Sequence, residues 1–188
     1  MTKGPRLFGS RSITDSLFTA RLELVAATPA MLRAELSDPA ELSGLLTARM
    51  PPYWPPEFYD RRDMERYLAN AEASTEAVTW GMRYVIERPA SALDARAVVG
   101  VAAFGSRPTA GGAVEIGYAI VPAARGRGFA TEAAVALVAW AFSDPRVLTI
   151  AARTFPHLAA SIRVLEKAGF ARVASHGDSP VLRFVIAR

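Results

Sequence analysis

The amino-acid sequence contains no cysteine and only two histidines among its 188 residues. The absence of cysteine excludes disulfides, a thiol nucleophile and every metal site that needs thiolate ligands. Two histidines also argue against a multi-histidine metal centre, so we expect no bound metal. Nothing in the composition indicates an oxidising compartment, and we expect a cytoplasmic protein.

Long apolar runs and a basic stripe are also missing. No segment approaches the roughly 18 uninterrupted apolar residues of a transmembrane helix, so we expect no membrane partner. The formal net charge is +4, but Lys3, Arg6 and Arg11 supply three of these charges within the first 14 residues. The rest of the chain lacks the clustered charge of a polyanion-binding surface, and we expect no nucleic-acid partner. A nucleic-acid binder that uses the basic N-terminal arm is the alternative.

The chain has enough apolar residues for one domain, since 51% of its residues are hydrophobic. We predict a mobile arm over residues 1–18 and a single domain over residues 19–188. Three successive strands joined by short turns predict antiparallel pairing, and the strand–helix–strand from 114 to 154 predicts one parallel crossover. The result is an α/β fold with a mixed, mostly antiparallel sheet and helices on both faces. The predicted strands are 21–26, 78–87, 97–104, 114–121, 147–154, 170–175 and 181–187, and the predicted helices start at Thr28 and Asp38 or span 60–73, 129–142 and 159–168.

The most informative segment is Arg125-Gly126-Arg127-Gly128, which joins a predicted strand to a predicted helix. The first amides of a helix have no partner within the helix, and the helix dipole makes that end positive. Two glycines let an anion approach the backbone, and two arginines add charge, so the segment predicts a phosphate or pyrophosphate site. No Gly-Lys-Ser/Thr follows, which excludes a Walker loop, and the third glycine of a dinucleotide fingerprint would fall at Thr131. A glycine-rich turn that merely starts a helix is the alternative.

Arg125-x-x-Gly128-x-Ala130 resembles the Arg/Gln-x-x-Gly-x-Gly/Ala loop of the GNAT superfamily of N-acetyltransferases. Residues 115–133 are similar to the branch that acetylates protein N-termini and small amines, the ribosomal-protein alanine acetyltransferase type. Residues 161–170 resemble the second motif of the family. The resemblance implies a single GNAT-type domain with a central strand–loop–helix site for acetyl-CoA.

In such a site the loop amides would hold the pyrophosphate of acetyl-CoA, and the two arginine side chains would neutralise its charge. The strand over 117–121 would pair with the pantetheine arm, and the thioester would enter where strands 114–121 and 147–154 splay apart. The amide of Ile120 or Val121 could stabilise the oxyanion. The implied cofactor-binding residues are Ile120, Val121, Arg125, Gly126, Arg127, Gly128, Phe129, Ala130 and Thr131.

The chain departs from the family pattern at two positions, where Leu158 and Leu165 replace the usual Asn and Tyr. That tyrosine usually protonates the leaving thiolate, and Ser161 is the substitute we predict. Its alternative is a helix residue that only bonds backbone. We predict Glu115 as the base that takes the proton of the amine, with His157 as its rival. The alternative for Glu115 is a solvated strand residue paired with an arginine.

The acceptor side is carried by a proline-rich loop, in which we predict Tyr53, Trp54 and Glu57 to bind the substrate. The alternative is that these side chains cover the core. The sequence thus predicts an enzyme that moves an acetyl group from acetyl-CoA to a primary amine, either a protein N-terminus or a small molecule, by direct attack. A catalytically weak acyl-CoA-binding regulatory module is the alternative. Acetyl-CoA and the amine are the expected partners, and a homodimer stays open.

Overall fold

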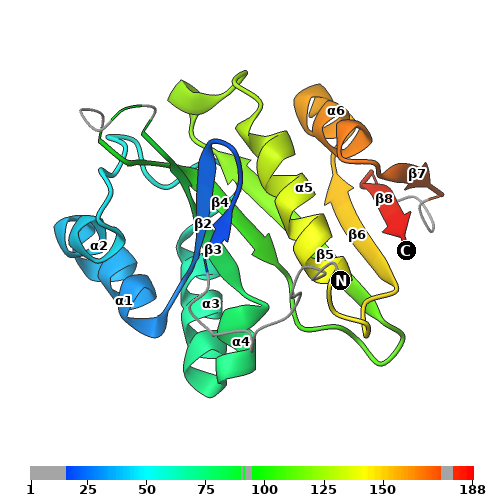
Figure 1. Cartoon of the computed structure of the whole chain (residues 1–188), viewed down its shortest axis with the longest axis horizontal. Coiled ribbons are helices and arrows are strands. Elements are labelled where there is room, and N and C mark those ends of the chain that lie inside the picture. Colours follow the sequence, from blue (N-terminus) through cyan, green and yellow to red (C-terminus); the bar gives the residue numbers. More distant parts are fainter. Residues whose placement is uncertain (1–15, 90, 92–94, 175–179) are drawn as a thin grey trace, which may run out of the picture.

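A computed structural model describes residues 16–89, 91, 95–174 and 180–188. The described residues form one eight-stranded sheet with helices on both faces (Figure 1). The strands are β1 (Leu17–Phe18), β2 (Leu22–Ala26), β3 (Met82–Glu87), β4 (Ala97–Phe104), β5 (Ala113–Ile120), β6 (Thr149–Thr154), β7 (Ala171–Val173) and β8 (Leu182–Ala187). The helices are α1 (Pro29–Ser37), α2 (Pro39–Leu46), α3 (Arg61–Ala73), α4 (Thr75–Thr79), the 3-10 helix η1 (Pro122–Ala124), α5 (Phe129–Phe142) and α6 (Ala159–Lys167).

The strands lie in the order β1-β2-β3-β4-β5-β6-β8-β7. Every neighbouring pair is antiparallel except β5 and β6, which are parallel. A parallel pair needs a long crossover, and α5 supplies it by carrying the chain back over the sheet. The predicted mixed, mostly antiparallel sheet is therefore confirmed.

Side-chain caps fix where the first helices begin. Thr28 accepts a hydrogen bond from the Met31 amide at the start of α1, and Asp38 accepts one from the Ala40 amide at the start of α2. Asp60 and Asp63 form a reciprocal capping box at the start of α3. These caps follow the residue types that the sequence offers, so the three starts agree with the prediction.

Several predicted boundaries differ from the structure, and two of the differences add an element to the fold. The strand predicted from residue 78 begins at Met82, because Ser74 caps the short helix α4 before it and accepts a hydrogen bond from the Ala77 amide. Two residues of the predicted arm, Leu17 and Phe18, pair with β2 as β1. Ser16, the remaining described residue of the arm, donates a hydrogen bond of 2.8 Å to Glu23. Residues 1–15 of the predicted arm lie outside the described residues.

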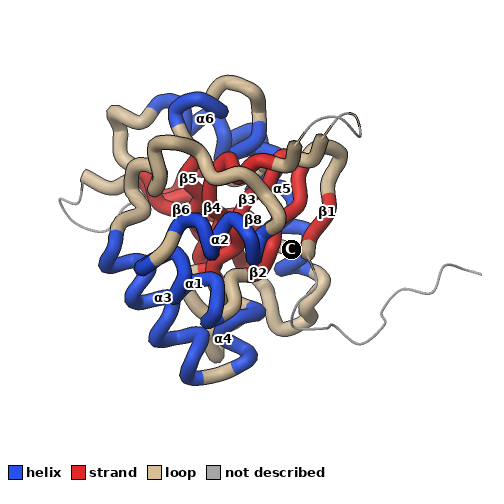
Figure 2. Tube along the Cα trace, turned by 90° about the vertical axis from the view of Figure 1, so that its left-hand side faces the viewer, coloured by secondary structure: helices blue, strands red, loops and turns tan. Residues whose placement is uncertain are grey.

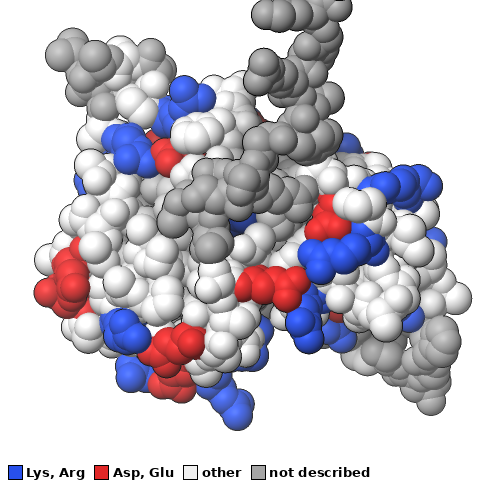
Figure 3. All heavy atoms as spheres, turned by 60° about the horizontal axis from the view of Figure 1, so that its bottom comes forward, with Lys and Arg blue, Asp and Glu red and all other residues white. Residues whose placement is uncertain are grey.

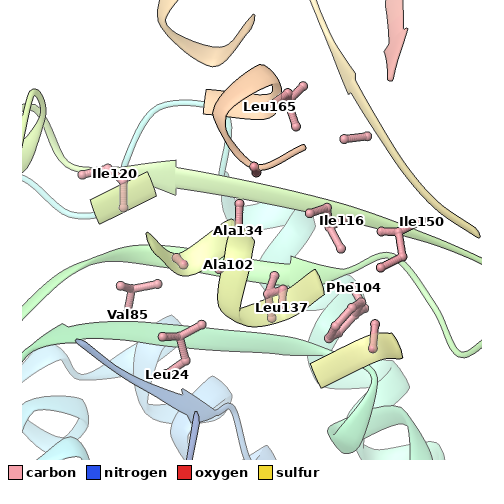
Figure 4. Packing of buried hydrophobic residues seen from close by; sticks show 14 of the residues in the cluster. Leu24, Val85, Ala102, Phe104, Ile116, Ile120, Ala134, Leu137, Ile150 and Leu165 are labelled. Atoms are coloured by element: carbon pink, nitrogen blue, oxygen red, sulfur yellow. The ribbon is translucent and has the colours of Figure 1, made fainter. Parts of the chain in front are cut away.

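The sheet separates two clusters of buried apolar residues. One cluster lies under α5 and α6, and Figure 4 shows Ala134 and Leu137 of α5 among strand residues such as Ala102 and Ile116. The other cluster lies under α1 to α4, on the opposite face (Figure 2). Burial of both faces of the sheet holds its central strands in place, and these strands carry the candidate site.

Candidate functional site

The parallel strands β5 and β6 separate before either of them ends. They pair only from Ala113 and Thr149 to Ile116 and Ala152. Beyond that point β5 continues along β4 as far as Ile120, while β6 continues along β8. This opening lies at the carboxyl ends of both strands, where open α/β sheets commonly bind ligands.

Successive residues of β5 point their backbone amide and carbonyl groups alternately toward β4 and toward the opposite side of the strand. The Glu115 carbonyl accepts a hydrogen bond from Gly105, and the Val121 amide donates one of 2.9 Å to the Val99 carbonyl, so the odd-numbered groups face β4. The peptide groups of Tyr118 and Ile120 therefore face the opening. This corrects one of the two predicted oxyanion donors, because the Val121 amide already serves the sheet and only the Ile120 amide faces the opening.

The glycine loop adopts the conformation that its residue types predict. Gly126 and Gly128 have φ angles of +77° and +83°, in the left-handed region that favours glycine. Gly128 is the N-cap of α5, and it offers no side chain to cap the helix. The amides of the first turn are thus left for another acceptor, which is the geometry of an anion site at a helix N-terminus.

A cavity of about 790 Å³ lies along this loop and the opening. Its lining is cationic, since Arg125, Arg153, Arg163 and Lys167 contribute to it and Glu57 is its one carboxylate. Of the residues predicted to bind the cofactor, those that line this cavity are Ile120, Arg125, Gly126, Gly128, Phe129, Ala130 and Thr131.

The two arginines of the glycine loop differ in their surroundings. Arg125 donates from Nε to the Ile120 carbonyl at 3.0 Å and from Nη2 to Glu57 at 2.9 Å, and it lines the cavity. Arg127 instead forms an ion pair with Glu87 on β3 and is not part of the cavity lining. This corrects the prediction that both side chains would neutralise the same anion.

A second set of contacts ties the start of α5 to the residues that lead into β2. Arg21 donates from Nε to Glu132 at 2.8 Å and from Nη1 to the Arg127 carbonyl at 2.9 Å, and Thr19 also donates to Glu132. Partial burial raises the pKa of Glu132, but the hydrogen bonds from Thr19 and Arg21 outweigh it and the pKa is lowered. The glycine loop is therefore held by charged side chains on the side away from the cavity.

A smaller cavity of about 230 Å³ lies on the other side of the opening. Phe58, Tyr59 and Tyr67 give it aromatic walls, and Asp63 is the one carboxylate in its lining. The two cavities share the residues at which they meet, and these are Phe58, Tyr118, Ala119, Arg153 and Ser161.

The predicted catalytic residues have different places. Ser161 lines both cavities, and its Oγ lies 3.2 Å from the Tyr118 hydroxyl. Glu115 lines neither cavity, and its carboxylate accepts a hydrogen bond of 2.8 Å from Arg153. The rival base His157 also lines neither cavity, and its ring stacks on Phe155 with 5.6 Å between centroids.

The two departures from the family pattern both lie at the site. Leu158 lines the larger cavity and Leu165 lines the smaller one. Burial raises the pKa of Tyr118 to about 12, although its hydrogen bond with Ser161 lowers it. The hydroxyls of Tyr118 and Ser161 are therefore the neutral proton donors where the cavities meet.

The structure corrects part of the predicted acceptor site. Tyr53 is 83% exposed, and Trp54 points inward, donating from Nε1 to Glu35 at 2.8 Å. Neither residue lines either of these two cavities, while Glu57 lines the larger one. Phe58 and Tyr59 belong to the same aromatic cluster of the proline-rich loop, and these two residues do line the smaller cavity.

Glu35 explains why this loop turns inward. Its carboxylate accepts hydrogen bonds from the hydroxyls of Tyr59 and Tyr84 at 2.9 and 2.7 Å, in addition to that from Trp54. Burial raises the pKa of Glu35, and these three hydrogen bonds lower it by less. The contacts tie the proline-rich loop to α1 and β3 and leave Phe58 at the junction of the cavities.

Charges elsewhere are mixed. On the face shown in Figure 3, acidic and basic side chains lie next to one another instead of gathering into one basic patch. Within the described residues, no helix has the length and apolar character to cross a membrane. The same residues contain no cluster of three or more histidine, cysteine, aspartate or glutamate side chains arranged to hold a metal ion.

Residues 21–171 match the family described as acetyltransferase (GNAT) domain. An acetyltransferase from Agrobacterium tumefaciens str. C58 has a similar structure, with a TM-score of 0.59 and 21% identity over 99% of this chain and 100% of that chain. RimL, a ribosomal L7/L12 alpha-N-protein acetyltransferase in complex with coenzyme A, gives a TM-score of 0.60 and 16% identity over 92% and 98%. The aminoglycoside acetyltransferase AAC(6')-Ib gives 0.55 and 24% over 89% and 95%. No curated protein matches the chain.

Proposed function

The chain belongs to the GNAT acetyltransferase family and depends on acetyl-CoA, and we propose that its acceptor is a terminal primary amine, either a protein N-terminus or a small linear amine. The observation that carries the proposal is the meeting of two unlike cavities at the opening between β5 and β6. One is large and cationic, and the other is small and aromatic, with Asp63 and the shared Arg153 as its charged residues. The amine would attack the thioester directly where they meet.

The larger cavity fits acetyl-CoA. The uncapped first turn of α5 and the amides of the glycine loop would hold the pyrophosphate, and Arg125 would neutralise part of its charge. Arg153, Arg163 and Lys167 add positive charge along the same cavity. The Tyr118 amide and carbonyl, which face the opening, would pair with the pantetheine arm. The Ile120 carbonyl accepts from Arg125, and the Ile120 amide would be left for the oxyanion.

The smaller cavity supports a terminal amine. Its volume of about 230 Å³ is below the roughly 300–1,000 Å³ of pockets that enclose drug-sized ligands, so it suits the end of a chain that enters amine first. Asp63 would attract the ammonium group, and the aromatic walls would contact the first side chain. The resemblance of residues 115–133 to the ribosomal-protein alanine acetyltransferase branch favours a protein N-terminus.

The amine must lose a proton before or during its attack. Glu115 is the proposed base, acting through a water molecule because it does not line the smaller cavity. Ser161 lines both cavities and would take part in supplying the proton that the departing thiolate needs. Because the chain has no cysteine, a covalent acetyl-thiol intermediate on the enzyme is excluded.

Thiol release from acetyl-CoA tests the acceptor. A panel would contain a peptide with a free N-terminus, the same peptide with its N-terminus blocked, a linear diamine and an aminoglycoside. We expect release with the free peptide or the diamine and none with the blocked peptide. Turnover confined to the aminoglycoside would contradict the proposed acceptor class. Stabilisation by acetyl-CoA without thiol release from any amine would favour the regulatory alternative.

A further inference from the structure

Tyr118 joins the two elements that border the opening. Its side chain extends from β5, and its hydroxyl lies 3.2 Å from both the carbonyl oxygen and the Oγ of Ser161 on α6. Beyond Ile116, β5 no longer pairs with β6. The phenol of Tyr118 therefore connects the unpaired end of β5 to α6 beside the opening.

The same side chain lines both cavities. Of the five residues that the cavities share, only Tyr118 and Ser161 carry a hydroxyl. Arg153 is also shared, but it is a permanent cation and is bonded to Glu115. Any neutral acid at the point where an acetyl group would pass between the cavities is therefore one of these two hydroxyls.

The chemistry of the two hydroxyls differs. A phenol has an ordinary pKa of about 10 and is a far stronger acid than the aliphatic hydroxyl of serine. Burial raises the pKa of Tyr118 to about 12, so the phenol keeps its proton at neutral pH and has one to give. The Ser161 hydroxyl can both donate and accept, so it can pass a proton to Tyr118 after Tyr118 has lost its own.

We propose that Tyr118 is a catalytic residue whose hydroxyl protonates the sulfur of the departing CoA thiolate, with Ser161 returning a proton to it. The amine nitrogen bonds to the acetyl carbon, the carbon–sulfur bond breaks, and its electron pair stays on sulfur. The proton moves from Tyr118 to sulfur, and Ser161 passes a solvent proton back to the phenolate. This inference rests on the proposed transfer to an amine. It assigns a strand residue to the proton-donating role for which Leu165, on α6, has no suitable group.

The first test needs no acceptor, so it separates this proposal from the choice of amine. CoA is bound to the wild type and to Tyr118→Phe, and the ultraviolet absorbance of its thiolate is followed as the pH is raised. A phenol beside sulfur stabilises the thiolate, so the bound thiol should ionise at lower pH in the wild type than in the variant. Identical titrations would overturn the proposal. Failure of the wild type to bind CoA would contradict both this proposal and the cofactor site.

The second test uses the best amine of the panel. Tyr118→Phe should lower kcat by roughly 100-fold, within the range of general acid catalysis, and leave KM for acetyl-CoA nearly unchanged. Incorporation of 3,5-difluorotyrosine at position 118 keeps the hydroxyl but makes it more acidic. The decrease of kcat at high pH, which occurs as the phenol ionises, should therefore move to lower pH. If Tyr118 only supported the fold, this part of the pH profile would not move. Loss of kcat in Ser161→Ala with full kcat in Tyr118→Phe would identify Ser161 as the donor and overturn the proposal.

Discussion

The two sides of the opening are built in different ways. The larger cavity draws most of its lining from two continuous stretches, residues 118–131 and 153–167. The smaller cavity draws its lining from the proline-rich loop and from elements far apart in the sequence, among them Tyr67 on α3, Met82 on β3 and Ala152 on β6, and no one of them supplies most of it. A site encoded by local conformation leaves a motif in the sequence, whereas a site assembled by tertiary contacts does not.

The two loops that reach these cavities repeat the contrast. The glycine loop takes its conformation from Gly126 and Gly128, whose positive φ angles are a local property. The proline-rich loop takes its position from Glu35, which lies on α1 and bonds Trp54 and Tyr59 of the loop. The acceptor side should therefore be sensitive to a change far from the loop, and the cofactor side to a change within it.

Removal of the Glu35 carboxylate should have the largest effect. Glu35→Ala leaves the donors of Trp54, Tyr59 and Tyr84 without their acceptor, and each buried unsatisfied donor costs about 1–3 kcal/mol. Some relaxation is expected, so we predict a loss of about 3–5 kcal/mol in the free energy of unfolding, measured by urea denaturation. Stabilisation by acetyl-CoA should persist in whatever fraction stays folded. A loss below about 1 kcal/mol would show that the loop is positioned in another way.

The pH dependence of this effect has a definite sign. Burial raises the pKa of Glu35 above its ordinary value of 4.5, so the folded protein holds this proton more tightly than the unfolded chain. The stability that comes from the protonated group is fully present below pH 4.5 and is lost as the pH rises through the raised pKa. Glu35→Gln cannot ionise, so its cost relative to the wild type should shrink from pH 4 to pH 8. A cost that grows over this range would mean that burial does not dominate.

Substitution within the glycine loop should be next in size. Gly128→Asp places a β-carbon at a φ angle of +83° and a carboxylate where the anion is expected, so affinity for acetyl-CoA should fall by roughly 100-fold. Thermal shift and titration calorimetry with acetyl-CoA measure it. Gly111→Asp is the matched control, because a β-carbon there has no neighbour closer than 3.9 Å and the residue is not at a positive φ. Equal losses in both variants would indicate a general effect of the added charge.

The same contrast explains what could be predicted from the sequence. The glycine loop, the helix starts at Thr28, Asp38 and Asp60 and the parallel crossover depend on neighbouring residues, and each is visible in the sequence. Tyr118 stands in the strand that carries the predicted Ile120, but its partner Ser161 is 43 residues away. Nothing local to that strand indicates that its side chain contacts α6.

The remaining errors have the same origin. Arg127 stands two residues after Arg125 in the same loop, and its pairing with Glu87, 40 residues earlier, turns it from the cavity. The sequence places Trp54 in a loop that could line a pocket, and only its hydrogen bond with Glu35 on α1 shows that it points inward. The error at residues 78–81, which were predicted as strand, has a local cause, because the cap residue Ser74 indicates the short helix α4.

The two arginines of the loop allow a finer test of the cofactor side. Arg125→Ala removes a cation from the cavity and should weaken acetyl-CoA binding about tenfold, or about 1.4 kcal/mol. Arg127→Ala removes a half-exposed ion pair with Glu87, so it should lower the free energy of unfolding by at most about 1 kcal/mol and change affinity by less than twofold. Both are measured by titration calorimetry and urea denaturation. Equal losses of affinity would restore the original prediction that both side chains meet the anion.

The smallest effect is expected at Glu115, which belongs to neither of the two cavities. It lies on the central strand that the motif identifies, yet it lines neither cavity and is held by Arg153. Because a base that acts through water contributes less than one in direct contact, Glu115→Gln should lower kcat by about threefold to fivefold, well under the usual range of roughly 100-fold or more. The acidic limb of the pH profile should also change, because the amide cannot take up a proton.

Asp63→Asn is the companion variant, and we expect it to raise KM for the amine more than it lowers kcat. An unchanged kcat and pH profile in Glu115→Gln would remove Glu115 from the mechanism. Asp63 would then be the carboxylate to examine both for binding the amine and for accepting its proton.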